Sequence, residues 1–251
     1  MSQESGSGKY EQLLLRCKNL EPVPTAVAHP CEASALAGAV EAAEKGLIVP
    51  ILVGPVAKIT DVARASGIDL SKFQIVDTPH SNASASKAVE LIRNGSAQVL
   101  MKGSLHTDEL MLAIVARETG LRTGRRISHA FIMDVPTYHK VLIVTDGAIN
   151  IAPTLEDKVD ICQNAIDLLA SLHIDRPRVA ILVAVEFVNS KMPATIEAAA
   201  LCKMAERGQI KGGLLDGPLA FDNAISKEAA DRKSTRLNSS HLKLSRMPSS
   251  A

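Results

Sequence analysis

Short runs of β-branched residues alternate with amphipathic helical stretches through most of this chain, and this alternation limits the possible folds most strongly. It is typical of α/β proteins, in which helices cover a sheet of mainly parallel strands. A side-chain composition that is 46% hydrophobic but only 2% aromatic also suits an aliphatic core of this kind. The expected strands span residues 25–28, 49–53, 73–76, 99–101, 127–134, 141–145, 179–185 and 210–215.

Two of the expected helices have recognisable ends. The stretch EASALAGAVEAAEKG places Leu36 and Val40 on one apolar stripe and stops at Gly46, a residue suited to a helix C-terminus. Asp157 follows Thr154 by three residues, which is the spacing of a capping box at a helix N-terminus.

The segment DVPTYHK, residues 134–140, interrupts the alternation and predicts a domain junction. We therefore expect a first α/β lobe over residues 8–136 and a second, truncated lobe over residues 137–231, with a cleft between them. Residues 232–251 are rich in serine and basic side chains and contain no acid. Such a segment cannot bury enough apolar surface to order itself, so we expect a disordered or non-native tail.

Charge and composition exclude several classes of partner. The formal charge of +1 and the pI near 7.7 give no electrostatic footprint for nucleic acid or an anionic membrane. No apolar stretch approaches the roughly 20 residues that cross a bilayer, and the start MSQESGSGKYEQ has no signal-peptide core. The four cysteines lack a zinc-binding spacing. We expect a cytoplasmic protein with reduced thiols and no metal.

Small or polar residues directly follow several expected strands, and open α/β sheets bind ligands at the carboxyl ends of their strands. His29-Pro30-Cys31-Glu32 follows the first strand. The helix that begins there could receive an anion at its N-terminus. Alternatively, Pro30 and Glu32 simply start the helix.

The run VLMKGSLHTDELM places Lys102, Gly103 and Ser104 after another strand, with His106 and Thr107 opening a helix. A lysine, hydroxyl groups and unpaired N–H groups are what a phosphate or pyrophosphate requires. The GxxxxGK pattern of a Walker loop is absent. A lysine exposed to solvent in a turn is an equally good interpretation.

Basic residues cluster in LRTGRRISHAF, which contains Arg122, Arg126 and Ser128. Guanidinium groups bind phosphate through paired hydrogen bonds, so a cofactor phosphate could lie here, although a solvated basic loop is the alternative. In the following loop TDGAIN, Asp146 and Asn150 either line the cleft or bond their own backbone, which is the commoner use.

The run LLDGPLAFDNAIS places Asp216, Gly217 and Pro218 at the end of a strand, with Asp222 beyond them. Asp216 and Asp222 are the candidate catalytic residues, because a carboxylate could orient a thiol or accept a proton; capping a helix is the alternative. The candidate substrate-binding residues are Lys102, Gly103, Ser104, His106, Thr107, Arg122, Arg126, Ser128, Asp146, Asn150, Gly217 and Pro218.

In their order and spacing, the phrases TAVAHPCE, LMKGSLHTDELM, GLRTGRRISHAFIMD, TDGAINIAP and ERGQIKGGLLDGPLAFDNAIS resemble the phosphate acetyl/butyryltransferase family. The resemblance covers about residues 10–231 and is closer to the butyryltransferase branch than to the acetyl-specific enzymes. It implies a two-lobed α/β fold like the isocitrate and isopropylmalate dehydrogenases, usually in a homodimer with the active site between the lobes. The implied reaction converts acyl-CoA and phosphate to acyl phosphate and CoA, with coenzyme A as a substrate and with no bound cofactor or metal.

Two departures from the family pattern matter. Leu112 stands where family members commonly carry an arginine that helps to hold phosphate. The family's Ser-Arg-x-Asp motif, which supplies catalytic groups, is absent, and Ser245-Arg246 lacks the acid that would complete it. We therefore expect a fold that is incomplete at its C-terminus, and the resemblance leaves the main catalytic residues unknown.

Two other functions remain open at this point. A catalytically impaired CoA-binding fragment is one, because of the missing motif. An NAD-dependent dehydrogenase on the same scaffold is the other. It is disfavoured because no GxGxxG follows the first strand and no aspartate cluster suits the metal that such enzymes use.

Overall fold

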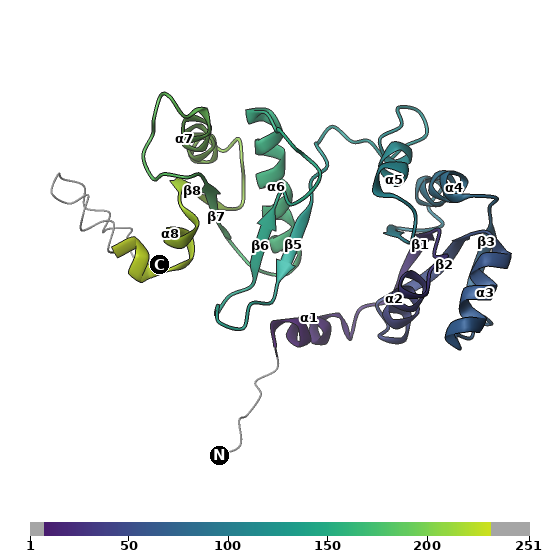
Figure 1. The fold of residues 1–251 in the computed structure, drawn as a ribbon. Coiled ribbons are helices and arrows are strands. Elements are labelled where there is room, and N and C mark those ends of the chain that lie inside the picture. The colour runs from purple at the N-terminus through teal and green to yellow at the C-terminus, as the bar shows by residue number, and fades with distance from the viewer. Residues whose placement is uncertain (1–7, 232–251) are drawn as a thin grey trace, which may run out of the picture. The chain divides into compact units, whose positions relative to one another are not determined.

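The computed structural model describes residues 8–231, which form parts of two compact units (Figure 1). The first unit ends at Arg125 and the second begins at Arg126, whereas the sequence suggested a junction between residues 136 and 137. The boundary lies earlier because the strand expected over residues 127–134 pairs with the strand that follows it, which keeps both in the second unit. The tail expected over residues 232–251 lies outside the described residues.

The first unit contains a four-stranded parallel sheet in the order β3-β2-β1-β4. Its strands confirm the first four expected from the sequence, within two residues at each end. They are β1 (Val23–Ala28), β2 (Ile48–Gly54), β3 (Gln74–Asp77) and β4 (Val99–Lys102). The helices of this unit are α1 (Lys9–Cys17), α2 (Ala33–Glu44), α3 (Val56–Ser66), α4 (Ser81–Arg93) and α5 (Thr107–Ile114).

Helices cover both faces of this sheet because successive strand residues point to opposite sides. Ala26 and Ala28 of β1 belong to a core cluster that includes residues of α4 and α5. Val27, between them, packs with Leu36 of α2 and Ile59 of α3 on the other face. Leu36 and Ile59 are fully buried, and each such side chain stabilises the fold by about 1.5–3 kcal/mol. The result is a three-layer α/β/α unit.

The strand order creates a switch point beside β1. The chain leaves β1 through α2 to β2 and through α3 to β3, and α4 then carries it back across the sheet to β4 on the other side of β1. The loops that follow β1 and β4 therefore leave toward opposite faces of the sheet. Open α/β sheets bind ligands in the crevice that this divergence leaves at the carboxyl edge.

The second unit contains two separate two-stranded sheets. Its core includes Cys162, Ile166, Leu201 and Ile210. The strands are β5 (Ala130–Met133), β6 (Leu142–Thr145), β7 (Arg178–Leu182) and β8 (Leu214–Leu219), and the helices are α6 (Leu155–Ser171), α7 (Pro193–Glu206) and α8 (Phe221–Ile225).

β5 and β6 pair antiparallel, because the connection between Met133 and Leu142 is too short for the crossover that parallel strands need, whereas β7 and β8 pair parallel. One expectation about this unit was wrong. The last strand begins at Leu214, after a turn with positive φ at Gly208 and Gly212, and not at residue 210. The capping box is confirmed, since the Thr154 hydroxyl accepts from the Asp157 N–H and the Asp157 carboxylate accepts from the Thr154 N–H.

Across residues 8–231, none of the helices combines the length and the apolar character needed to cross a bilayer.

Candidate active site

The loops that follow β1 and β4 meet at the switch point of the first unit. The backbone N–H and the hydroxyl of Ser104 both donate to the carbonyl oxygen of His29, at 2.9 and 2.8 Å. The Gly103 N–H donates to the carbonyl oxygen of Ala28 at 2.8 Å, and the Cys31 N–H donates to Ser104 Oγ at 3.2 Å. The structure therefore brings together two of the loops that the sequence singled out.

Gly103 is required where these loops cross. A Cβ atom at this position would lie 2.4 Å from the carbonyl oxygen of Ala28 and 2.5 Å from that of His29. Both atoms belong to the backbone at the end of β1, so neither can turn aside as a side chain would. The absence of a side chain at Gly103 allows the hydrogen bonds of Ser104 to form.

His29 occupies the centre of this junction with a φ of 56°, which is uncommon for a residue other than glycine. Its Nδ1 lies 3.1 Å from the hydroxyl of Ser84, which in turn lies 2.8 Å from the hydroxyl of Thr78. Ser84 is fully buried and Thr78 nearly so. Burial lowers the pKa of His29, and the nearby Lys58 lowers it further.

Sequence reasoning missed Thr78, Ser84 and Lys58. The first two belong to the phrase TPHSNASAS, which follows β3 as the recognised loops follow their strands. Small polar residues after a strand were thus an available signal. Lys58 carried no comparable signal, because a lysine on an exposed helical face is ordinary.

The other residues of the β4 loop surround this junction. The exposed Lys102 donates to its neighbour, the carbonyl oxygen of Gly103, at 3.2 Å. His106 is the N-cap of α5, and its N–H donates to Glu109 at 3.1 Å. The Glu109 carboxylate also accepts a hydrogen bond from the Ser81 hydroxyl at 2.8 Å. The bond from Ser81 contributes most to lowering the pKa of Glu109, and the bond from the His106 N–H lowers it further. The exposed Thr107 opens the helix.

In the second unit, Asp146 organises the loop that follows β6. Its carboxylate accepts the N–H groups of Ala148, Ile149 and Asn150, each at 3.0 Å, and that of His129 at 3.2 Å. Partial burial opposes ionisation, but these bonds prevail and lower the pKa of Asp146 to about 2. Asp146 is thus a turn residue that bonds backbone, which was one of the two interpretations the sequence left open.

Arg126 and Asn150 lie in contact beside this loop. Arg126 Nε donates to Asn150 Oδ1 at 2.8 Å and lies 3.5 Å from a carboxylate oxygen of Asp157. Ser128 accepts a hydrogen bond from the Asn164 side chain at 2.9 Å. Arg122, however, belongs to the first unit. The arginine cluster of the sequence is therefore divided between the two units.

The Asp216-Gly217-Pro218 segment lies within β8 and not at the end of a strand, contrary to expectation. The strand continues through Pro218 because its pairing with β7 shifts register between Ala180 and Leu182, and such an irregularity accommodates a residue that cannot donate to the ladder. Asp216 is exposed.

Asp222 lies in the first turn of α8, and its carboxylate accepts the Asn223 N–H at 3.0 Å. No geometry described for Asp216 or Asp222 joins them to the junction of the first unit. Their catalytic role stays a prediction.

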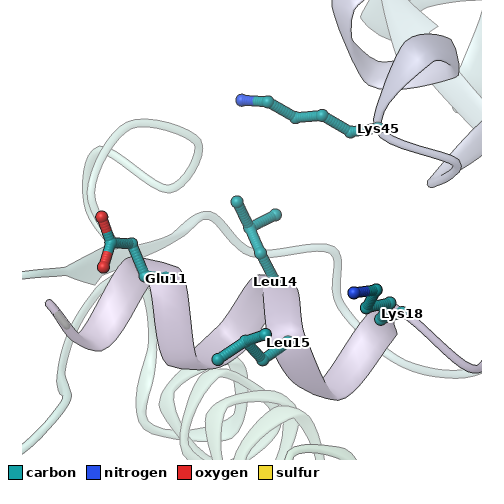
Figure 2. A pocket seen from close by; sticks show the side chains of 5 residues that line it. All are labelled: Glu11, Leu14, Leu15, Lys18 and Lys45. Atoms are coloured by element: carbon teal, nitrogen blue, oxygen red, sulfur yellow. The ribbon is translucent and has the colours of Figure 1, made fainter.

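A separate hollow of about 420 Å³ lies between α1 and the last turn of α2 (Figure 2). Leu14, Leu15 and Lys18 of α1 line it together with Glu11 and Lys45. Lys45 follows the C-terminus of α2, and a crossover helix ends near the amino edge of its parallel sheet. The hollow is therefore not part of the junction at the carboxyl edge.

Within the described ranges, no cluster of three or more histidine, cysteine or acidic side chains is suited to hold a metal ion.

A family model described as "Phosphate acetyl/butaryl transferase" matches residues 81–241. The chain belongs to the phosphate acetyl/butyryl transferase family. The phosphate acetyltransferase of Rhizobium meliloti is 62% identical over 88% of this chain and 70% of its own length. The phosphate acetyltransferase of Rickettsia typhi is 54% identical over 92% of this chain and 66% of its own length. The chain thus spans about two thirds of the length of these acyltransferases.

Solved structures agree with this family fold. A phosphotransacetylase from Streptococcus pyogenes superposes with a TM-score of 0.73 at 18% identity, covering 90% of this chain and 76% of that protein. At this identity the likeness shows the α/β fold alone.

The names of the relatives correct one expectation. The phosphate butyryltransferase of Clostridium acetobutylicum is 38% identical over 89% of this chain, well below the acetyltransferases of Rhizobium meliloti and Rickettsia typhi. The expected closeness to the butyryltransferase branch is therefore not supported, although membership of the transferase family is confirmed. The dehydrogenase alternative is not favoured.

Proposed function

We propose that this chain binds acyl-CoA and phosphate and serves the exchange of coenzyme A and phosphate on a short acyl group. The observation that carries the proposal is the joining of the β1 and β4 loops through His29 and Ser104 at the switch point, in a chain of this family. The acyl group is acetyl, since the relatives that are 62% and 54% identical to this chain are named acetyltransferases.

The protein itself takes part in few covalent steps of this reaction. A phosphate oxygen attacks the thioester carbonyl carbon, the carbon–sulfur bond breaks, and coenzyme A leaves as a thiolate. Catalysis must hold the phosphate in line, polarise the carbonyl oxygen and stabilise the leaving sulfur. Lys102 supplies the first of these needs, and Arg122 and Arg126 are the proposed contacts for further phosphate groups.

We assign the remaining properties on the same basis. The two units correspond to the lobes of an isocitrate/isopropylmalate dehydrogenase-like fold. Coenzyme A is a substrate and not a bound cofactor, and the protein works in the cytoplasm, as its four free cysteines and its substrates suit. Neither nucleic acid nor a membrane is a partner.

A homodimer is the proposed assembly. Phe131 and Ile132 of β5 are consecutive, so they point to opposite faces of the strand, and 48% and 42% of their surfaces are exposed. Val144 of β6 is 41% exposed. Apolar surface of this kind suits burial against a second copy.

The proposal is tested by the release of free CoA from acetyl-CoA and butyryl-CoA in the presence of phosphate. This chain is assayed beside a version extended with the C-terminal part of the Rhizobium meliloti relative. Turnover of acetyl-CoA by either protein supports the proposal, and turnover by the extended protein alone assigns this chain a binding role. Failure of both proteins to release CoA would overturn it.

Replacing Lys102 by alanine is expected to weaken phosphate binding about tenfold, because a charge-assisted contact is lost. Calorimetric titration with phosphate measures the effect without requiring turnover. Lys72→Ala is the matched control, because Lys72 is exposed and precedes β3 at the opposite edge of the sheet. Equal phosphate affinity in the Lys102→Ala variant and the wild type would remove Lys102 from the site.

A further inference from the structure

We infer that His29 is a specificity-determining residue, whose Nε2 accepts a hydrogen bond from the P–OH group of hydrogen phosphate and so distinguishes phosphate from sulfate. The inference rests on the proposed function, in which phosphate is a substrate. It goes further by assigning to one side chain the recognition of the substrate's proton.

The hydroxyl of Ser84 lies within hydrogen-bonding distance of the backbone carbonyl oxygen of His80 at 3.0 Å, the Thr78 hydroxyl at 2.8 Å and His29 Nδ1 at 3.1 Å. A serine hydroxyl has a single proton to donate, and the carbonyl oxygen is the one of these three groups that can only accept. The inferred arrangement therefore gives this proton to His80 and makes Ser84 Oγ the acceptor toward Thr78 and His29. In that arrangement Nδ1 carries the proton of the imidazole, and Nε2 has a lone pair.

This arrangement is held firmly. Ser84 is fully buried and Thr78 is 7% exposed, so water does not compete for their hydroxyl groups. The backbone of His29 is fixed as well, because its carbonyl oxygen accepts from Ser104 twice and its N–H donates to the carbonyl oxygen of Val53 at 2.7 Å. A residue held at a φ of 56° in this way has its side-chain direction set by the loop junction.

Nε2 is the atom left for a ligand. No hydrogen bond within residues 8–231 engages it, and it is not among the buried polar atoms that lack a partner, so it keeps some solvent-accessible surface. It belongs to the residue directly after β1, where the switch point opens the carboxyl edge of the sheet.

The charges around His29 favour a neutral ring beside an anion. Burial, Lys58 on α3 and His80 before α4 all lower its pKa, and Glu109 on α5 opposes them. A lowered pKa favours the neutral imidazole, in which Nε2 is an acceptor. Two lysines supply positive charge on either side of β1. One is Lys58, and the other is Lys102, which lies at the end of β4 beside Ala28.

An acceptor at this place distinguishes two otherwise similar anions. At mildly alkaline pH phosphate is a dianion with one remaining O–H group, whereas sulfate is a dianion with none. The lysines attract both anions alike. Only hydrogen phosphate, or the similar hydrogen arsenate, can donate a hydrogen bond to Nε2. A sulfate oxygen would instead face the lone pair of Nε2 with no proton between the two atoms. Preference for phosphate thus follows from the tautomer of His29.

The experiment measures phosphate, arsenate and sulfate affinity by calorimetry at mildly alkaline pH. The variants are His29→Asn and Ser84→Ala. Asparagine tolerates a positive φ but is too short to replace Nε2. Ser84→Ala leaves His29 in place and removes the acceptor that fixes its tautomer. Ser86→Ala is the matched control, an exposed serine on the same helix.

Both variants are expected to bind phosphate and arsenate about tenfold more weakly, and to change sulfate affinity by less than about twofold. Ser86→Ala is expected to match the wild type. Nitrogen-15 NMR of the wild-type chain is expected to show a protonated Nδ1 and an unprotonated Nε2 on His29.

Three results would overturn the inference. One is a proton on Nε2 in the wild type, and another is an unchanged ratio of phosphate to sulfate affinity in folded Ser84→Ala protein. If CoA release still depends on phosphate in these cases, the proposed function stands and only the role of His29 fails. The third is a wild-type chain that binds no phosphate, which would remove both.

Discussion

Alanine at position 103 is expected to destabilise the first unit by roughly 3 kcal/mol and to abolish phosphate binding there. The added Cβ would meet the carbonyl oxygens of Ala28 and His29 at 2.4 and 2.5 Å. Both oxygens are fixed by hydrogen bonds from the β4 loop, so relief requires the two loops to separate. Separation would also break the bonds between Ser104 and His29 on which the proposed site depends.

Urea unfolding followed by circular dichroism measures this loss of stability, and phosphate calorimetry measures the loss of binding. Gly124→Ala is the matched control, because no atom lies within 4 Å of a Cβ at Gly124 and its φ is not positive. A Gly103→Ala protein that unfolds at the wild-type urea concentration would show that the close approach between the loops does not exist.

Removal of the Asp146 carboxylate is expected to have the second largest effect. Asp146→Ala leaves the N–H groups of Ala148, Ile149 and Asn150 without their acceptor, and we expect a loss of about 3 kcal/mol in the second unit. Amide hydrogen exchange of these three residues reports the local change directly. Exchange rates that match those of the wild type would contradict the role given to Asp146.

The same carboxylate predicts a pH dependence. Its folded pKa of about 2 lies below the usual aspartate value, so the folded state favours the ionised form. The stabilisation, about 2 kcal/mol, is fully present above roughly pH 4 and is lost as the pH falls toward 2. Asp146→Asn should therefore lose much of the acid sensitivity of the second unit, and the exposed Asp175→Asn should keep it. Identical acid unfolding of the two variants would count against this linkage.

The two predictions concern different parts of the proposed chemistry. Gly103 and His29 shape the β1–β4 junction of the first unit, where we place phosphate. Asp146 holds the loop that positions Asn150 and, through it, Arg126 in the second unit. Arg122 and Arg126 belong to different units, so an alanine variant of each tests them one at a time.

The sequence by itself determined what depends on neighbours along the chain. Alternation of strand and helix patterns predicted the four strands of the first sheet, and the spacing of Thr154 and Asp157 predicted a capping box that the structure contains. The positions of Lys102 at the end of one strand and of His29 directly after another indicated candidate site loops. Each of these features depends on interactions within a few residues, so a local pattern is sufficient to reveal it.

Only the tertiary structure decided how distant segments meet. It made β5 and β6 antiparallel, placed Gly217 inside β8 and divided the arginine cluster between two units. It also joined His29 Nδ1 to the hydroxyl of Ser84, 55 residues away. Strand direction and long-range hydrogen bonds follow from the packing of whole elements against one another, and no periodicity within a single segment encodes that packing.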